Sequence, residues 1–330
     1  MCGSRLFWVK PREGEFEKGS PPFCVLRRTA MRPSAGTPFD QLAFSRLLPV
    51  SCSLGRRLEY RPSVPSTMGV ARELIGVEGG ARLHGTVVLT DDQTAGVGRR
   101  GRSWDAEVCC SLLFSLVWAP AAAGTPAVFP ELIRLNLAAP VAVVGACSAV
   151  GVGSAQIKWP NDVWAGGLIP RKLSGVILDY DGGDSAVLGV GLNVLQDMER
   201  HPAATSIATL LGAASASAAP SPLPVDGAGP PCLRERLLSC FCVELDRLMR
   251  LETSAVIAEH ARHDLLRGKT IRVHHKTREE YDPRDYDAVA LGIGADGALR
   301  VRPVGAPAAA AVYLSAEEVS ITPYPLSGGR

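Results

Sequence analysis

The chain has 330 residues, of which 46% are apolar, and this fraction is large enough to bury a sizeable core in one to three domains. Its formal net charge is only +2, which gives no general reason to expect a nucleic acid or a membrane as partner. The nine cysteines form no C-x-x-C pair and have no histidine at zinc-finger spacing, which indicates reduced thiols in an intracellular protein without a metal site.

Residues 1–58 mix Pro, Gly, Ser and Arg without a sustained hydrophobic period, and they carry ten Arg or Lys against four Asp or Glu. This composition predicts an N-terminal extension that is either disordered or a targeting sequence for a plastid or mitochondrion, on an otherwise cytoplasmic protein. The segment has no period typical of a helix-turn-helix, so we expect no DNA binding.

A folded domain is predicted from residue 59. Ser66 or Thr67 caps a helix, because apolar residues follow at helical spacing. Runs of β-branched and other apolar residues predict buried strands, and a longer apolar stretch predicts a helix over 131–150. No apolar run reaches eighteen residues, and Pro140 interrupts the richest, so no membrane span is expected. The expected strands cover 85–93, 111–118, 155–160, 173–180 and 186–194.

In the second half of the chain the residue composition changes at two places. Residues 212–231 are low in complexity and rich in Ala, Pro and Ser, which predicts a flexible insertion, and residues 233–252 have the pattern of an amphipathic helix. Residues 264–325 contain short apolar runs around Gly and Asp-Gly turns, typical of a small β-barrel. The expected fold is therefore α+β, with a layered domain of strands and helices over 59–253 followed by a barrel.

The stretch Q-T-A-G-V-G-R-R-G-R-S-W, residues 93–104, follows an expected strand. Its glycines permit close backbone approach to a ligand, and its arginines match phosphate or carboxylate oxygens. It is neither a Walker A loop nor a dinucleotide-binding G-x-G-x-x-G motif. From these residues alone, an anion site and a solvated basic turn are equally supported.

Lysine is scarce, with six lysines against 29 arginines, and Lys158 and Lys172 lie close together in sequence. Lys158 and Trp159 end an expected strand in K-W-P-N-D, where a sheet presents ligand-binding side chains, although Lys158 pairing with Asp162 and a core role for Trp159 stay open. Lys172 enters a strand, and an ammonium there could offset charge that develops on a carboxylate and an α-phosphate. Asn193, after two strand glycines, could bond a purine edge.

Together these motifs resemble the catalytic domain of biotin–protein ligases, also called holocarboxylase synthetases. The resemblance covers about 130 residues from Ser66 and continues to a C-terminal segment similar to the family's SH3-like barrel. It implies the mixed-sheet fold of the biotin/lipoate ligases. The motifs are Ser66-Thr67, Q-x-x-G-x-G-R-x-G-R-x-W (93–104), K-W-P-N-D (158–162), R-K-L-x-G (171–175) and G-x-G-x-N (189–193).

The resemblance implies that the enzyme activates biotin with ATP to biotinyl-5′-AMP and transfers it to a lysine of a carboxyl carrier domain in a biotin-dependent carboxylase. Mg²⁺ would neutralise the triphosphate, and no protein ligand to a metal is assigned. Lys172, Arg99 and Lys158 are the implied catalytic residues. The implied biotin-binding residues are Ser66, Thr67, Met68, Gln93, Gly96, Val97, Gly98, Arg99, Lys172, Gly175 and Gly189. The implied residues for ATP and the adenylate are Arg99, Arg102, Trp104, Lys158, Asn161, Lys172 and Asn193.

Some positions depart from the family pattern. Met68 stands where many members have Asn, Val97 where bacterial members have Arg, and Cys109 where Gly is frequent. The span from Asp162 to Arg171 is about three residues longer than in bacterial members. Two alternatives stay open: a lipoate or octanoate ligase, which shares the fold, and a catalytically silent biotin-binding sensor, against which the retained lysines argue.

Overall fold

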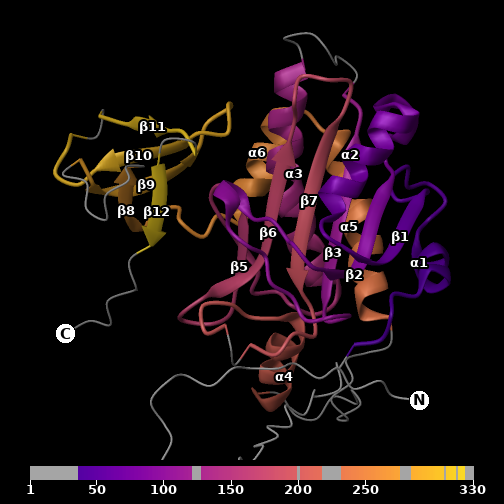
Figure 1. Cartoon of the computed structure of the whole chain (residues 1–330). Helices are drawn as coiled ribbons and strands as arrows, with labels where there is room; N and C mark the ends of the chain where they lie inside the picture. The colour runs from indigo at the N-terminus through magenta and orange to yellow at the C-terminus, as the bar shows by residue number, and fades with distance from the viewer. Residues whose placement is uncertain are drawn as a thin grey trace, which may run out of the picture. The chain divides into compact units, whose positions relative to one another are not determined.

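The structure, a computed structural model, describes residues 36–120, 128–198, 201–217, 232–275, 284–307, 310–316 and 319–323. Its larger element is a seven-stranded sheet in the order β1-β2-β3-β7-β6-β5-β4 (Figure 1). Strands β1 and β2 are parallel, and every other neighbouring pair is antiparallel. The strands are β1 (Leu58–Val64), β2 (Val87–Gln93), β3 (Ser111–Trp118), β4 (Gln156–Lys158), β5 (Asp162–Ala165), β6 (Arg171–Asp179) and β7 (Ala186–Asn193).

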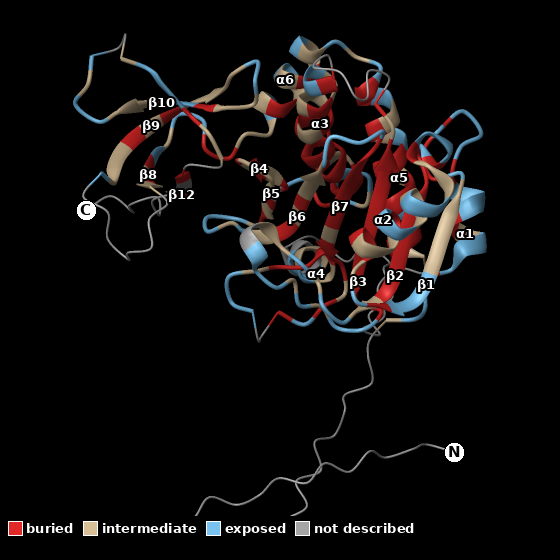
Figure 2. Cartoon of the chain, turned by 45° about the horizontal axis from the view of Figure 1, so that its top comes forward, coloured by how far each residue is buried: buried red, intermediate tan, exposed pale blue. Residues whose placement is uncertain are grey.

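Helices cover both faces of this sheet. On one face, α3 (Val128–Ala149) and α5 (Leu233–Met249) bury their apolar residues against the strands, and on the other face α2 (Thr67–Glu78) packs over β2, β3 and β7. Helix α3 is long and apolar enough to cross a membrane, but 67% of its most apolar window is buried in this core (Figure 2). The other helices are α1 (Gln41–Leu47), α4 (Ile207–Ser217), α6 (Thr253–Arg262), and the 3₁₀ turns η1 (Gly80–Leu83) and η2 (Arg99–Gly101).

The C-terminal region forms a second sheet of five antiparallel strands in the order β11-β10-β9-β8-β12, consistent with a small SH3-like barrel. Trp159, which follows β4, is buried in the core of this sheet and donates its indole N–H to the Gly297 carbonyl at 3.0 Å. Trp159 thus fills core, one of the two roles that its sequence allowed. The strands are β8 (Thr270–His275), β9 (Tyr286–Ile293), β10 (Leu299–Pro303), β11 (Val312–Leu314) and β12 (Val319–Pro323).

Strand β7 shows how the sheet makes room for a site. Because alternate residues of a strand point to opposite faces, Leu188, Val190 and Leu192 enter the core under α3 and α5. The intervening residues face α2, and here Val187 packs under the helix whereas the next two positions are Gly189 and Gly191. The two glycines leave a hollow beyond the helix N-terminus.

The boundaries expected from the sequence need three corrections. Residues 36–57 are part of the catalytic domain and not of an extension, because Asp40 caps α1 and Phe44 buries its ring in the main core. A seven-residue helix is too short to show a hydrophobic period. Residues 212–217 of the expected flexible insertion belong to α4, and helix α6 was not predicted. Residues 1–35 and 218–231 lie outside the described residues.

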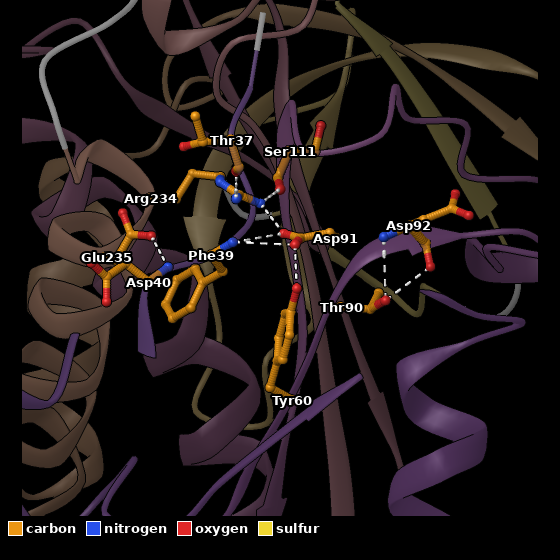
Figure 3. Close-up of polar contacts among 10 residues, drawn as sticks. All are labelled: Thr37, Phe39, Asp40, Tyr60, Thr90, Asp91, Asp92, Ser111, Arg234 and Glu235. Carbon is orange, nitrogen blue, oxygen red and sulfur yellow. Dashed lines mark hydrogen bonds and ion pairs between the residues drawn. The ribbon is translucent and has the colours of Figure 1, made fainter. Parts of the chain in front are cut away.

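A buried ion pair ties the N-terminal segment to the sheet (Figure 3). Arg234, on α5, donates to the Asp91 carboxylate at 2.6 Å, and both side chains are about 5% exposed or less. The same carboxylate accepts hydrogen bonds from the Tyr60 hydroxyl and the Phe39 amide, so its lone pairs are satisfied. Arg234 also donates to the Thr37 carbonyl. Asp91 thereby holds β1, β2, α5 and residues 37–39 together.

Candidate active site

The hollow on the α2 face is a cavity of about 470 Å³ including its open mouth. We call it the central cavity. Its floor is made by β3, β6 and β7, its end by the N-terminus of α2, and its roof by the loop that follows β2. It is lined by Ser66, Thr67, Met68, Gln93, Val97, Gly98, Arg99, Trp104, Leu113, Phe114, Asn161, Lys172, Gly175, Ile177, Gly189, Val190 and Gly191.

One end of the central cavity carries a fixed set of polar groups. Ser66 is the N-cap residue of α2, and the Thr67 amide donates to the Gln93 side-chain oxygen at 3.0 Å. The Thr67 hydroxyl lies 2.8 Å from the Ser115 hydroxyl on β3. Since the Gln93 oxygen is used by Thr67, its NH₂ group is left as the donor toward a ligand. Met68 lies above Gly189, where an added Cβ would come within 3.0 Å of its Sδ and Cγ atoms.

The loop over the cavity has its own internal structure. Val97 and Ser103 form an isolated antiparallel bridge, the Gly98 amide donates to the Arg102 carbonyl at 2.6 Å, and the Trp104 amide donates to the Gly96 carbonyl at 2.9 Å. Gly101 has φ of +71°, a conformation that glycine adopts without strain. The loop is therefore a small folded hairpin that holds Val97, Gly98 and Arg99 above the cavity.

Arg99 is held at the edge of the central cavity by contacts on two sides. Its Nη1 donates to the Asn161 side-chain oxygen at 3.2 Å, and its Nη2 donates to the Ala316 carbonyl at 3.4 Å. The Asn161 NH₂ group donates in turn to the Val176 carbonyl at 2.6 Å. Asn161 was assigned to ATP from the sequence. In the structure it lines the cavity, but both ends of its amide are used to position the Arg99 guanidinium.

Trp104 lies across two glycines that face each other on neighbouring strands. Gly175 of β6 pairs with Gly191 of β7. A Cβ at Gly191 would lie 2.5 Å from the Trp104 ring, and one at Gly175 would lie 3.1 Å from it, so only glycine leaves room for the indole. The indole nitrogen is buried without a hydrogen-bond partner among the described residues. The ring thus offers a flat face to a ligand.

Lys172 lies where two cavities meet. Its Nζ is 2.8 Å from Asp162 and 5.4 Å from the centre of the Trp104 ring. Its backbone N–H donates to the Ala203 carbonyl, which fixes the segment after β7 against β6. Asp162 of K-W-P-N-D therefore pairs with Lys172. This positioning role was missed from the sequence, although the adjacency of β5 and β6 could have indicated it.

The second cavity lies on the other side of Trp104 and Lys172, which line both cavities. Asn193 lines it and donates its NH₂ group to the Thr205 carbonyl at 3.1 Å. Its Oδ1 atom is therefore left as the acceptor toward a ligand, which suits the exocyclic amine of adenine. The remaining lining residues are Ser103, Asp105, Gln196, Met198, His201 and Ala204, none of which the sequence analysis assigned.

Three predicted site residues line neither of these cavities. Gly96 contributes only backbone, whose carbonyl accepts from Trp104. The Lys158 ammonium lies 4.9 Å from the centre of the Trp164 ring. Burial lowers its pKa, the charge of Asp162 opposes this shift, and the charges of Lys172 and Arg102 add to it. Lys158 and Arg102 therefore add positive potential near Lys172. The other predicted site residues line one or both cavities.

Comparison with known proteins agrees with this arrangement. Residues 62–193 match the model of the biotin/lipoate A/B protein ligase family. The chain is 34% identical over 190 residues to the biotin--[acetyl-CoA-carboxylase] ligase of Mycobacterium tuberculosis, covering 56% of this chain and 65% of that protein. It is 31% identical over 193 residues to the bifunctional ligase/repressor BirA of Bacillus spizizenii, covering 57% and 53%. The matches thus span about half to two thirds of these relatives.

A solved structure shows the same fold. A biotin protein ligase from Aquifex aeolicus in complex with biotin and ATP superposes with a TM-score of 0.59 at 19% identity, covering 82% of this chain and all of that one. A mutant of the Aquifex aeolicus ligase in complex with biotin gives a TM-score of 0.58. The segment that contributes most of both cavities, residues 62–193, therefore matches the biotin/lipoate A/B protein ligase family and is similar to biotin–protein ligases.

Proposed function

We propose that this chain activates biotin with ATP and transfers the biotinyl group to a lysine of a biotin carboxyl carrier domain. The observation that carries the proposal is the junction of two cavities at Lys172 and Trp104. The central cavity suits the vitamin, because Gln93 and Thr67 offer hydrogen-bonding groups at one end and the strands offer apolar walls. The second cavity suits the nucleotide, because Trp104 offers a flat face and Asn193 an acceptor.

In the first half-reaction, a biotin carboxylate oxygen attacks the α-phosphorus of ATP, the bond to the β-phosphate oxygen breaks, and pyrophosphate leaves. The Lys172 ammonium, beside Asp162, would exchange this partner for the phosphoryl oxygens as their charge grows. In the second half-reaction, a neutral lysine amine attacks the acyl carbon, the bond to the phosphate oxygen breaks, and AMP leaves. The amine proton goes to solvent, and an amide remains.

We expect Mg²⁺ to enter with the triphosphate. Among the described residues no group of three or more His, Cys, Asp and Glu side chains converges on one point. Phosphate oxygens and water would therefore hold most of its coordination sphere, as is usual for magnesium–nucleotide complexes. The ion would neutralise the charge of the leaving pyrophosphate.

The proposal is tested by incubating the full chain with ATP, Mg²⁺, biotin and a carrier domain, and by measuring the mass of the carrier. We expect the mass to rise by one biotinyl group, and no rise when biotin or ATP is left out. Biotin-dependent exchange of pyrophosphate into ATP tests the first half-reaction alone. Exchange with lipoate or octanoate in place of biotin would favour the lipoate-ligase alternative, and no exchange with any of these acids would leave only a sensor.

A further inference from the structure

A third cavity lies beside the central cavity and has no ligand in the scheme above. It is bounded by the start of α3, by β6 and by the turn after β4, and it measures about 720 Å³ including its open mouth. Most of its lining is apolar, and among the described residues that line it only Arg99 carries a formal charge. The lining residues that it does not share with the central cavity include Phe129, Leu132, Ile133, Asn136, Val176 and Leu178.

The wall between the third and the central cavity is a pair of hydrogen-bonded side chains. Arg99, Asn161 and Ile177 line both cavities. The Arg99 guanidinium donates to Asn161 at 3.2 Å, and Asn161 donates to the backbone of β6 at 2.6 Å. A group that enters from the third cavity therefore reaches the central cavity past Arg99, and not past Trp104 and Lys172, which line the second cavity.

The apolar lining decides what this cavity can bind. The proposed reaction has three reactants, and the central and second cavities suit biotin and ATP. Pyrophosphate would meet only one cation in this lining, Arg99, and most of its charged oxygens would face apolar side chains of α3 and β6, which is unfavourable. An apolar side chain would bury its surface there at no such cost. The third reactant, a protein segment that carries the acceptor lysine, can supply such a side chain.

We propose that the third cavity is the docking site of the acceptor turn of the carrier domain. It takes an apolar side chain next to the acceptor lysine, while the lysine itself passes Arg99 to the acyl carbon. This inference rests on the proposed function. Phe129 is its expected anchor, because its ring is 57% exposed at the rim of the cavity whereas Leu132 below it is only 6% exposed. Exposed aromatic side chains beside a pocket commonly dominate binding between proteins.

The test separates the two half-reactions in Phe129→Glu. We expect biotin-dependent pyrophosphate exchange to change by less than twofold, because Phe129 lines neither the central nor the second cavity. We expect kcat/KM for transfer to the carrier domain to fall about tenfold or more, mainly through KM, since burying one aromatic side chain commonly contributes that much to binding. Hydroxylamine, a small nucleophile that needs no docking, should take biotin from the adenylate at the rate of the unmodified chain.

Two further variants serve as controls. Phe129→Leu keeps an apolar rim and should restore most of the carrier transfer. Val77→Glu places the same charge on a more exposed apolar position of α2, where the residue is 85% exposed, and should leave all three rates unchanged. Carrier transfer by Phe129→Glu at the unmodified rate would overturn the docking site, and so would an equal loss toward hydroxylamine. A chain that forms no adenylate at all would instead refute the proposed function, and the docking site with it.

Discussion

Replacing Arg234 by methionine should destabilise the catalytic domain more than any single exposed substitution. The change keeps a long apolar side chain but leaves the Asp91 carboxylate charged, about 4% exposed and without its cation. It also removes hydrogen bonds to the Thr37 and Ser111 carbonyls. Breaking a buried ion pair on one side costs about 3–5 kcal/mol, a large part of the roughly 5–15 kcal/mol by which a domain is stable. Urea unfolding measures this loss as a lower midpoint.

A double-mutant cycle isolates the pair itself. Asp91→Asn alone leaves the guanidinium of Arg234 buried without its anion, whereas the two substitutions together leave no unpaired charge. An amide oxygen at the Oδ2 position can still accept from both the Tyr60 hydroxyl and the Phe39 amide. We therefore expect the double variant to be more stable than the sum of the single losses by about 2 kcal/mol or more. Arg236→Met, at an exposed position of the same helix, is the matched control and should be neutral. Single losses that add within about 0.5 kcal/mol would refute the reasoning.

Three further outcomes follow from single side chains. Lys172→Met should lower biotin-dependent pyrophosphate exchange about 100-fold or more, because it removes the cation at the cavity junction. The unfolding midpoint should fall only slightly, since the Asp162 side chain that loses its partner is 20% exposed and can be hydrated. Retained exchange would contradict the catalytic role of Lys172. Gly191→Ala should raise KM for ATP about tenfold, because the added Cβ would lie 2.5 Å from the Trp104 ring. Gly189→Ala should change mainly KM for biotin, because its Cβ meets the flexible end of the Met68 side chain. Initial rates at varied concentrations of ATP and of biotin measure both effects. His260 is fully buried with neither ring nitrogen bonded among the described residues, and burial lowers its pKa to about 4. The unfolded chain binds this proton below about pH 6.5 and the folded chain only near pH 4, so about 3 kcal/mol of stability is lost as pH falls through this window. The free energy of unfolding of His260→Leu should therefore depend less on pH than that of the unmodified chain. An equal pH dependence in the two proteins would contradict a buried, neutral His260.

The fold was predictable where each segment carries its own signal. The strand from Ser111 is buried at every position and gives a short continuous apolar run, and the helix from Leu233 is amphipathic and shows the helical period. The segment from Gln41 to Leu47 was missed because two turns of helix give no period and its stability comes from Phe44 in a distant core. Strand β1 was missed for a related reason: it is half-exposed, and its parallel partner β2 lies more than twenty residues further along the chain.

The sequence predicted most residues that line the site, but not which of them face a ligand and which position another side chain. Motif spacing brought most lining residues together, but it could not tell a ligand contact from a support. Asp162 and Asn161 look alike in the motif as polar turn residues. In the structure one pairs with Lys172 and the other holds Arg99, because β5 lies antiparallel to β6 and the loop folds back over both. Such pairings depend on tertiary contacts between segments far apart in sequence.

The position of Arg99 relates the loop to all three reactants of the proposed reaction. It lies at the wall shared by the central and third cavities, and its guanidinium is bound to the turn after β4 and to the Ala316 carbonyl of the C-terminal region. A substrate carboxylate or phosphate would compete for the same donors, since a guanidinium binds an anion more strongly than a neutral amide oxygen. Binding of the adenylate would therefore draw Arg99 away from Asn161. The wall toward the third cavity would then open when an anionic group of a substrate or of the adenylate binds Arg99, and the acceptor lysine could pass it once the acyl group is activated.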